Sequence, residues 1–170
     1  MTAEPVDALP RWLSPAELTA WRPLGGLLLK LPAALDAAMQ RDSGLSHFEY
    51  LVLASLSEAP GRSRRMSALA ALANGSLSRL SHVVKRLEAR GWVRRAACPE
   101  DGRFTDAVLT DAGWDKVVAS APGHVEAVRT LVIDALTDDE LVEIGGIARR
   151  VLARLDGADG RSAFGEPAVE

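Results

Sequence analysis

The chain has 170 residues, with 20 lysines and arginines against 23 aspartates and glutamates, so its formal net charge is −3. This length fits one compact domain, or one domain that carries dimerisation arms. Apolar residues make up 48% and charged residues 25% of the chain, as in folded proteins, which excludes disorder for most of it. The single cysteine, Cys98, excludes an intrachain disulfide and a multi-cysteine metal cluster.

Neither a membrane span nor a secretory signal is predicted. A span needs about 20 uninterrupted apolar residues, whereas the most apolar run, residues 24–31, contains Lys30 and is followed by Pro32. The N-terminal segment includes Glu4 and Asp7 and lacks the basic and then apolar order of a signal peptide. We therefore expect a cytoplasmic protein.

Three tetrapeptides mark helix starts. In each, a serine or threonine N-cap is followed three residues later by a glutamate, so that both side chains can bond a free backbone N–H. They are Ser14-Pro15-Ala16-Glu17, Ser46-His47-Phe48-Glu49 and Thr137-Asp138-Asp139-Glu140.

Taken in chain order, the predicted elements are mostly helices. Apolar spacing and turn residues predict helices over 15–40, 47–57, 66–73, 78–90, 111–136 and 138–155, and strands over 92–96 and 104–109. Pro23 and Pro32 are expected to kink or divide the first helix, and Pro122 with Gly123 to bend or break the fifth. Residues 1–10 and 156–170 have the composition of mobile tails.

Basic residues are concentrated in the middle of the chain. Residues 61–105 contain ten basic and three acidic residues, so this segment carries +7 and the remainder −10. A basic middle between acidic flanks favours a nucleic-acid face on an acidic scaffold. A solvated charged surface is the alternative, and the position of the charge relative to the motifs decides between the two.

The predicted helix over 78–90 has two distinct faces at about 100° per residue. The apolar face, expected to be buried, consists of Leu77, Leu80, Val83, Val84 and Leu87. The opposite face consists of Ser78, Ser81, His82, Lys85, Arg86 and Ala89, with Arg79 at its edge. Small hydroxyl residues let a helix approach bases closely, and basic residues can bond guanine or neutralise phosphates. Without the hairpin that follows, a solvated amphipathic helix would be the favoured interpretation.

A short helix, a tight turn at Asn74-Gly75, a second helix and a basic hairpin form the layout of a winged helix-turn-helix. The segment DGRFTDAVLTDAG (101–113) resembles the wing signature of the MarR (multiple antibiotic resistance regulator) family of bacterial transcription factors: Asp, any residue, Arg, five residues, Leu-Thr, two residues, Gly. SRLSHVVKRLEARGWVRR (78–95) resembles the recognition helix and first wing strand of that family, MSALAALA (66–73) its preceding helix, and GLSHFEYLVLASL (44–56) its second helix. The resemblance extends over about residues 13–155.

The resemblance implies a mainly α fold of about six helices with a two- or three-stranded wing. Residues 46–110 would form the DNA-binding lobe, and 11–45 with 111–155 the dimerisation helices. In this family the wing-tip arginine, here Arg103, enters the minor groove, and the aspartate, here Asp101, orients it. A homodimer would read a palindromic site with half-sites about one helical turn apart.

Eleven residues are the predicted DNA contacts, and they fall into three groups. At the major groove we expect Ser76, Ser78, Arg79, Ser81, His82, Lys85 and Arg86. At the minor groove we expect Arg103, oriented by Asp101, while Arg94 and Arg95 would lie near phosphates.

The family also binds small ligands in a cleft between the dimer core and the DNA-binding lobe. This implies a small aromatic or phenolic effector near Trp21, His47 and Tyr50, which would release DNA by shifting the spacing of the two lobes. Packing in the dimer core is the alternative role of these side chains.

No catalytic, cofactor or metal site is predicted. The sequence lacks a Gly-x-Ser-x-Gly elbow, a phosphate-binding glycine loop and a His-Glu-x-x-His helix. His47, His82 and His124 lack the spacing of a zinc site, and Cys98 is interpreted as an incidental wing cysteine. The sequence thus predicts a DNA-binding transcriptional regulator, a repressor rather than an enzyme. A winged-helix module that binds proteins is the alternative, favoured by the acidity of the chain and by Asp106 in the wing.

Overall fold

The computed structural model describes residues 10–70, 76–98 and 101–155. Its contacts divide the chain into two units, residues 1–34 and 35–170, which are described separately. The first unit contains most of helix α1 (Pro15–Ser43). The predicted capping box starts this helix, since the Ser14 N–H donates to Glu17 Oε2 at 2.7 Å and the Glu17 N–H to Ser14 Oγ at 3.3 Å.

Helix α1 differs from its prediction in two respects. Pro23 and Pro32 lie inside it without dividing it, because the loss of a single helical N–H leaves the neighbouring bonds in place. The helix also runs past Gln40 to Ser43, whose hydroxyl donates to the Met39 carbonyl at 2.8 Å. Gly44 then ends it, with a φ of 66° that disfavours side chains with a Cβ.

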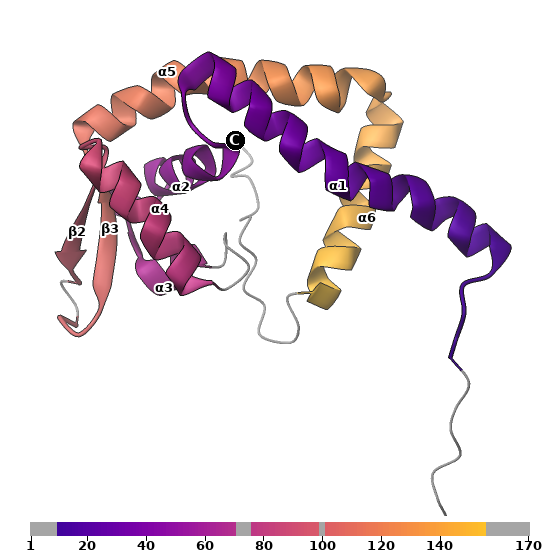
Figure 1. The fold of residues 1–170 in the computed structure, drawn as a ribbon, viewed down its shortest axis with the longest axis horizontal. Coiled ribbons are helices and arrows are strands. Elements are labelled where there is room, and N and C mark those ends of the chain that lie inside the picture. The colour runs from indigo at the N-terminus through magenta and orange to yellow at the C-terminus, as the bar shows by residue number, and fades with distance from the viewer. Residues whose placement is uncertain (1–9, 71–75, 99–100, 156–170) are drawn as a thin grey trace, which may run out of the picture. The chain divides into compact units, whose positions relative to one another are not determined.

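The second unit is mainly α-helical, as predicted (Figure 1). In chain order it contains α2 (His47–Ser57), the 3₁₀ turn η1 (Pro60–Arg62), β1 (Ser63–Arg65), α3 (Met66–Leu69), α4 (Leu77–Ala89), β2 (Val93–Ala97), β3 (Thr105–Leu109), α5 (Asp111–Leu131), the 3₁₀ turn η3 (Ile133–Ala135) and α6 (Asp138–Leu155). The second and third capping boxes are present at the starts of α2 and α6. The predicted turn at Asn74-Gly75 and the predicted tails, apart from Pro10, lie outside the described residues.

The wing is a three-stranded antiparallel sheet in the order β1-β3-β2. Its register pairs Val93 with Leu109 at one end and Arg65 with Asp106 towards the other. Strand β1 was not among the predicted strands, because three polar residues carry no apolar alternation. It covers the free edge of β3, so that Ala107 in the central strand is fully buried.

The core lies between α2, α3, α4 and the sheet. The predicted apolar face of α4 is confirmed for four of its residues, namely Leu80, Val83, Val84 and Leu87. Leu77, expected on the same face, is instead 51% exposed. It is the first residue of α4, directly after the N-cap Ser76, and therefore lies beyond the packed turns of the helix.

The C-terminal helices also depart from their predicted limits. Helix α5 passes through Pro122 and Gly123 without a break and ends at Leu131, not at 136. Helix α6 buries none of its residues, and its exposed apolar residues are Val142, Ile144, Ile147, Val151, Leu152 and Leu155. In the part of the chain that the structure describes, no helix is both long and apolar enough to span a bilayer.

Candidate nucleic-acid interface

Helix α4 presents the predicted polar face to solvent. Ser76 caps the helix by accepting from the Arg79 N–H at 3.3 Å. The predicted contact residues Ser76, Ser78, Arg79, His82, Lys85 and Arg86 are all exposed, and Ser81 is half-buried. The face has this position because the apolar residues at helical spacing bury the other side of α4.

The wing is joined to α4 by Arg95. Its Nη2 donates to the backbone oxygen of Ser81 at 2.9 Å and to Ser81 Oγ at 3.2 Å, and its backbone N–H donates to Glu88 Oε1 at 3.0 Å. Ser81 and Arg95, both predicted DNA contacts, are therefore brought together and hold the wing against the helix. Arg94, the neighbouring predicted contact, is exposed on β2.

The wing tip carries an exposed arginine on a carboxylate. Arg103 Nη2 donates to Asp101 Oδ2 at 2.7 Å, Arg103 Nε to Asp101 Oδ1 at 3.0 Å, and the Arg103 backbone N–H to the same oxygen at 3.1 Å. The side chain of Arg103 is nevertheless 85% exposed. The guanidinium lowers the pKa of Asp101, which keeps this carboxylate charged. The folded chain thus contains a contact between Asp101 and Arg103, as the prediction requires.

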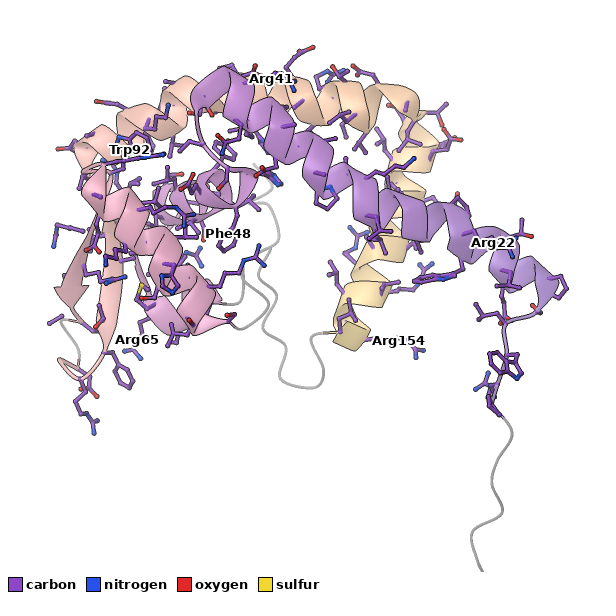
Figure 2. All side chains as sticks on the ribbon, in the orientation of Figure 1. Arg22, Arg41, Phe48, Arg65, Trp92 and Arg154 are labelled. Atoms are coloured by element: carbon purple, nitrogen blue, oxygen red, sulfur yellow. The ribbon has the colours of Figure 1, made fainter. Side chains whose placement is uncertain are left out.

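A hollow of about 330 Å³ is lined by residues of the wing, α3 and α4. Its lining includes Arg65, Ser67, Arg95, Arg103 and Phe104. Arg65, which is labelled in Figure 2, has its guanidinium 5.0 Å from the centre of the Phe104 ring. The hollow is therefore bordered by three arginines, which suits an anionic partner.

A second hollow, of about 520 Å³, lies at the N-terminal end of α4. It is lined by Asp36, Ser46, Phe48, Ser76, Ser78, Arg79, His82, Val83 and Arg86. Arg79 lies over the ring of Phe48, labelled in Figure 2, at 5.2 Å from its centre. Five of the predicted DNA contacts thus border a single concave surface.

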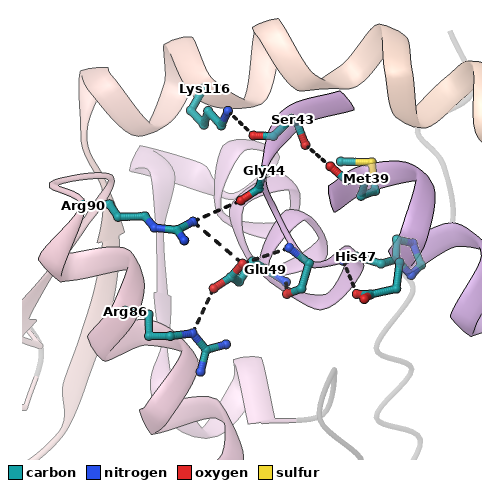
Figure 3. A network of polar contacts seen from close by, with 10 residues as sticks. Met39, Ser43, Gly44, His47, Glu49, Arg86, Arg90 and Lys116 are labelled. Carbon is teal, nitrogen blue, oxygen red and sulfur yellow. Dashed lines mark hydrogen bonds and ion pairs between the residues drawn. The ribbon is translucent and has the colours of Figure 1, made fainter. Parts of the chain in front are cut away.

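Arg86, predicted as an outward contact, is exposed and also has a partner on α2. Its Nε donates to Glu49 Oε1 at 3.0 Å, across from α4 to α2 (Figure 3). Glu49, with 3% exposure, and Arg90 are functional candidates that were not predicted. The sequence signalled Glu49 only as the acid of a capping box, and nothing local linked it to α4.

Two of the predicted effector residues, His47 and Tyr50, both contact the ring of His124. The ring of Tyr50 lies 4.5 Å from that of His124, and the ring of His47 stacks on His124 at 5.5 Å. Tyr50 is buried, and burial raises its pKa. Trp21, the other predicted effector residue, belongs to the first unit, where its side chain is 52% exposed.

The predictions on metal binding, Cys98 and Asp106 can also be compared with the structure. Among the described residues, no group of three His, Cys, Asp or Glu side chains is arranged to hold a metal ion. Cys98 is a buried free thiol. Asp106 is also buried, at 7% exposure, so that it does not add a surface acid to the wing as expected.

Comparisons with known proteins agree with this geometry. A family model described as the MarR family matches residues 43–103. Sco3205, a MarR family transcriptional regulator from Streptomyces coelicolor crystallised in complex with DNA, is 44% identical, with a TM-score of 0.83 over 91% of this chain and 96% of that chain. AbsC, a MarR family regulator from the same organism, is 37% identical, with a TM-score of 0.81 over 87% of this chain and 99% of that chain.

Curated relatives match over a smaller share of their length. The transcriptional repressor MprA of Escherichia coli is 25% identical over 118 residues, which are 69% of this chain. The chain spans between 54% and 66% of the length of the curated relatives that it matches.

Proposed function

Because the chain belongs to the MarR family of transcriptional regulators, we propose that it binds a specific palindromic promoter site as a homodimer and regulates transcription from it. The family consists of regulators and not of enzymes, in agreement with the prediction from sequence. Its relative Sco3205 was crystallised with DNA, which supports DNA as the partner of this chain.

The observation that carries the proposal is the junction of the wing with α4. Arg95 bonds Ser81, so the wing is held beside the exposed face of α4, and the exposed Arg103 lies at the tip of that wing. A helix of this kind fits the major groove, where side chains reach base edges. An exposed guanidinium beyond it suits a narrow minor groove, where the negative potential is concentrated.

The homodimer is supported by apolar surface that the single chain leaves uncovered. The first unit exposes Trp21, Leu24, Leu27 and Leu28 on α1, and α6 exposes apolar residues along its length. Exposed apolar faces of this extent mark interfaces, and a two-fold dimer would present two copies of α4 to two half-sites.

Repression and release by an effector complete the proposal. Repression is supported by MprA, a relative that is a transcriptional repressor. The effector would be a small aromatic or phenolic molecule near His47 and Tyr50. The rings of His47, Tyr50 and His124 join α2 to α5, so a ligand there could shift the DNA-binding lobe relative to the dimerisation helices. Such a regulator would work in the cytoplasm.

Binding to the DNA that flanks the protein's own gene tests the proposal. Fluorescence anisotropy across a salt series is expected to show site-selective binding with a steep salt slope. Arg103→Ala is expected to weaken operator binding about 10- to 100-fold. Arg129→Ala, which removes an arginine on α5 that pairs with Asp134, is the matched control and should bind like the wild type.

The outcome also decides the alternative of a protein-binding module. Its support from Asp106 is lost, because this carboxylate is buried in the wing. Binding that fails to distinguish promoter DNA from random sequence, even in a wider operator screen, would leave the protein-binding module as the better hypothesis.

A further inference from the structure

Glu49 is a buried carboxylate shared by α2 and α4. It is the third residue of α2, where its Oε2 accepts from the Ser46 N–H at 2.9 Å and its own N–H donates to Ser46 Oγ at 3.1 Å. Its Oε1 accepts from Arg86 Nε at 3.0 Å, and Arg90 Nη1 lies 3.9 Å from its Oε2 (Figure 3). One acid therefore faces Arg86 of the proposed recognition helix and Arg90, the residue that caps its C-terminal end.

The same network continues to the end of α1 and to α5. Arg90 Nη1 donates to the Gly44 carbonyl at 3.4 Å, and Lys116 Nζ from α5 donates to the Ser43 carbonyl at 2.6 Å. These carbonyls belong to the C-terminal end of α1, where the helix dipole favours cations. The contacts drawn in Figure 3 thus fix α4 against α2 and the end of α1.

Arg86 has one edge inside this network and one outside it. Its Nε is bonded to the buried Glu49, while its side chain is 54% exposed and lines the hollow that Ser78, Arg79 and His82 also border. The guanidinium therefore reaches the proposed DNA surface in a direction set by Glu49. A planar guanidinium held at one edge keeps its other edge available for a directional hydrogen bond.

Glu49 is charged in the folded protein. Burial by itself would raise the pKa of Glu49, but the bond from Ser46 and the charges of Arg86 and Arg90 together lower the pKa below its ordinary value. Arg86 thus carries its own counter-charge before DNA binds. By contrast, Lys85, its exposed neighbour on α4, makes no ion pair among the described residues.

We propose that Glu49 is a positioning residue for DNA recognition: it neutralises and orients Arg86, so that Arg86 contributes to the choice of sequence and not to the general attraction for phosphates. The inference rests on the proposed DNA-binding function and adds to it a residue, Glu49, that affects which DNA sequence is bound. An arginine that is already neutralised releases few counterions on binding, whereas an unpaired lysine at a phosphate changes the salt slope by about 0.9.

The first test replaces the two neighbouring cations on α4. Fluorescein-labelled duplexes of the operator and of a scrambled sequence of the same length are titrated between low and moderate salt. Arg86→Gln is expected to leave the salt slope unchanged and to lower the ratio of operator to scrambled affinity about tenfold. Lys85→Gln is the matched control, expected to reduce the slope by about 0.9.

The second test replaces the acid. Glu49→Gln keeps an oxygen that can accept from the Ser46 N–H but removes the counter-charge of Arg86. We expect tighter binding to scrambled DNA, a slope steeper by about 0.9 and a lower affinity ratio. Glu58→Gln makes the same change of charge at the other end of α2 and should behave like the wild type. Adding Arg86→Gln to Glu49→Gln should abolish the steeper slope.

The possible outcomes distinguish a failure of this inference from a failure of the proposed DNA-binding function. Wild-type protein that does not distinguish operator from scrambled DNA would overturn the proposed function. Selective wild-type binding, together with an Arg86→Gln variant that loses about 0.9 of slope and keeps its affinity ratio, would overturn the inference alone. The Arg86→Gln measurement decides the matter even if Glu49→Gln does not fold.

Discussion

The imidazoles of His47 on α2 and His124 on α5 stack with ring centres 5.5 Å apart and planes inclined by 26°. The two residues are far apart in sequence, and their contact joins α2 to α5. Nδ1 of His124 is buried and has no hydrogen-bond partner among the described residues. Both rings are therefore held in an environment that disfavours their charged forms.

Because of this histidine pair, we expect the folded protein to become less stable as the pH falls. Burial lowers the pKa of His47, an effect that Asp36 partly opposes, and burial together with His47 lowers the pKa of His124. Below about pH 6.5 the unfolded chain then binds more protons than the folded chain, so the free energy of unfolding falls as the pH falls. Urea unfolding at pH 7.5 and 5.5 is expected to show this decrease.

Substitution of His124 tests whether the histidine pair causes this loss of stability in acid. His124→Gln is expected to reduce the difference in unfolding free energy between the two pH values. His82→Gln removes a histidine outside the pair and serves as the control. A His124→Gln variant with the full wild-type pH dependence would show that the loss of stability arises elsewhere.

Asp101 is predicted to help Arg103 without being essential. Asp101→Asn removes the charge that accepts from Arg103 Nε and Nη2. Because exposed ion pairs contribute little, operator affinity is expected to fall only about two- to fivefold. Anisotropy titrations of Asp101→Asn and Arg103→Ala should therefore differ clearly. An equal loss in both variants would mean that Arg103 reaches DNA only when Asp101 orients it.

Gly113, the last residue of the wing signature, is predicted to be required for packing. A Cβ at this position would overlap the carbonyl of Trp92, which already accepts from the Thr110 N–H at 3.0 Å, and would lie 2.7 Å from Leu109 Cδ1. Gly113→Ala is expected to lower the free energy of unfolding by about 1–3 kcal/mol or more. Thermal unfolding of the two variants tests this. Gly26→Ala is the control and should be neutral or stabilising, because it lies on α1 where a Cβ meets no atom within 4 Å.

His82 is predicted to read sequence. Its side chain is exposed on α4 beside the hollow at the N-terminal end of that helix. His82→Ala is expected to change the order of preference among operator variants and to leave the salt slope unchanged, because base contacts specify and phosphate contacts position. Arg94→Gln should reduce the salt slope and leave the order of preference unchanged. A shared loss of slope in both variants would assign His82 to the DNA backbone.

Features encoded within a few residues could be predicted from the sequence. The capping boxes at Ser14, Ser46 and Thr137 formed as expected, because a side chain can reach a backbone N–H only one turn away. The buried face of α4 and the hairpin after it followed from periods of 3.6 and 2. The contact between Arg103 and Asp101 is likewise local, since these residues are two positions apart.

Some predictions from local sequence were wrong because contacts elsewhere in the structure decided the outcome. Pro23, Pro32 and Pro122 do not divide their helices, because the other hydrogen bonds of each long helix outweigh the loss of one donor. The kink or bend that was expected as the alternative stays a prediction. Leu77 has the right helical phase for burial, but the core ends before it. Strand β1 forms only because β3 offers it an edge, which a three-residue segment does not signal.

The sequence by itself determined the layout of a winged helix-turn-helix with a basic segment, since spacing and charge are local properties, and its wing signature resembles that of the MarR family. Only the tertiary structure decided which charged groups meet. Glu49 and Arg86 are 37 residues apart, and their bond exists because the packing of α4 against α2 places a buried acid beneath an exposed arginine. The pairing of His47 with His124 has the same origin in the contact of α2 with α5. Long-range polar contacts of this kind depend on the apolar core that brings the helices together, and no spacing along the chain specifies them.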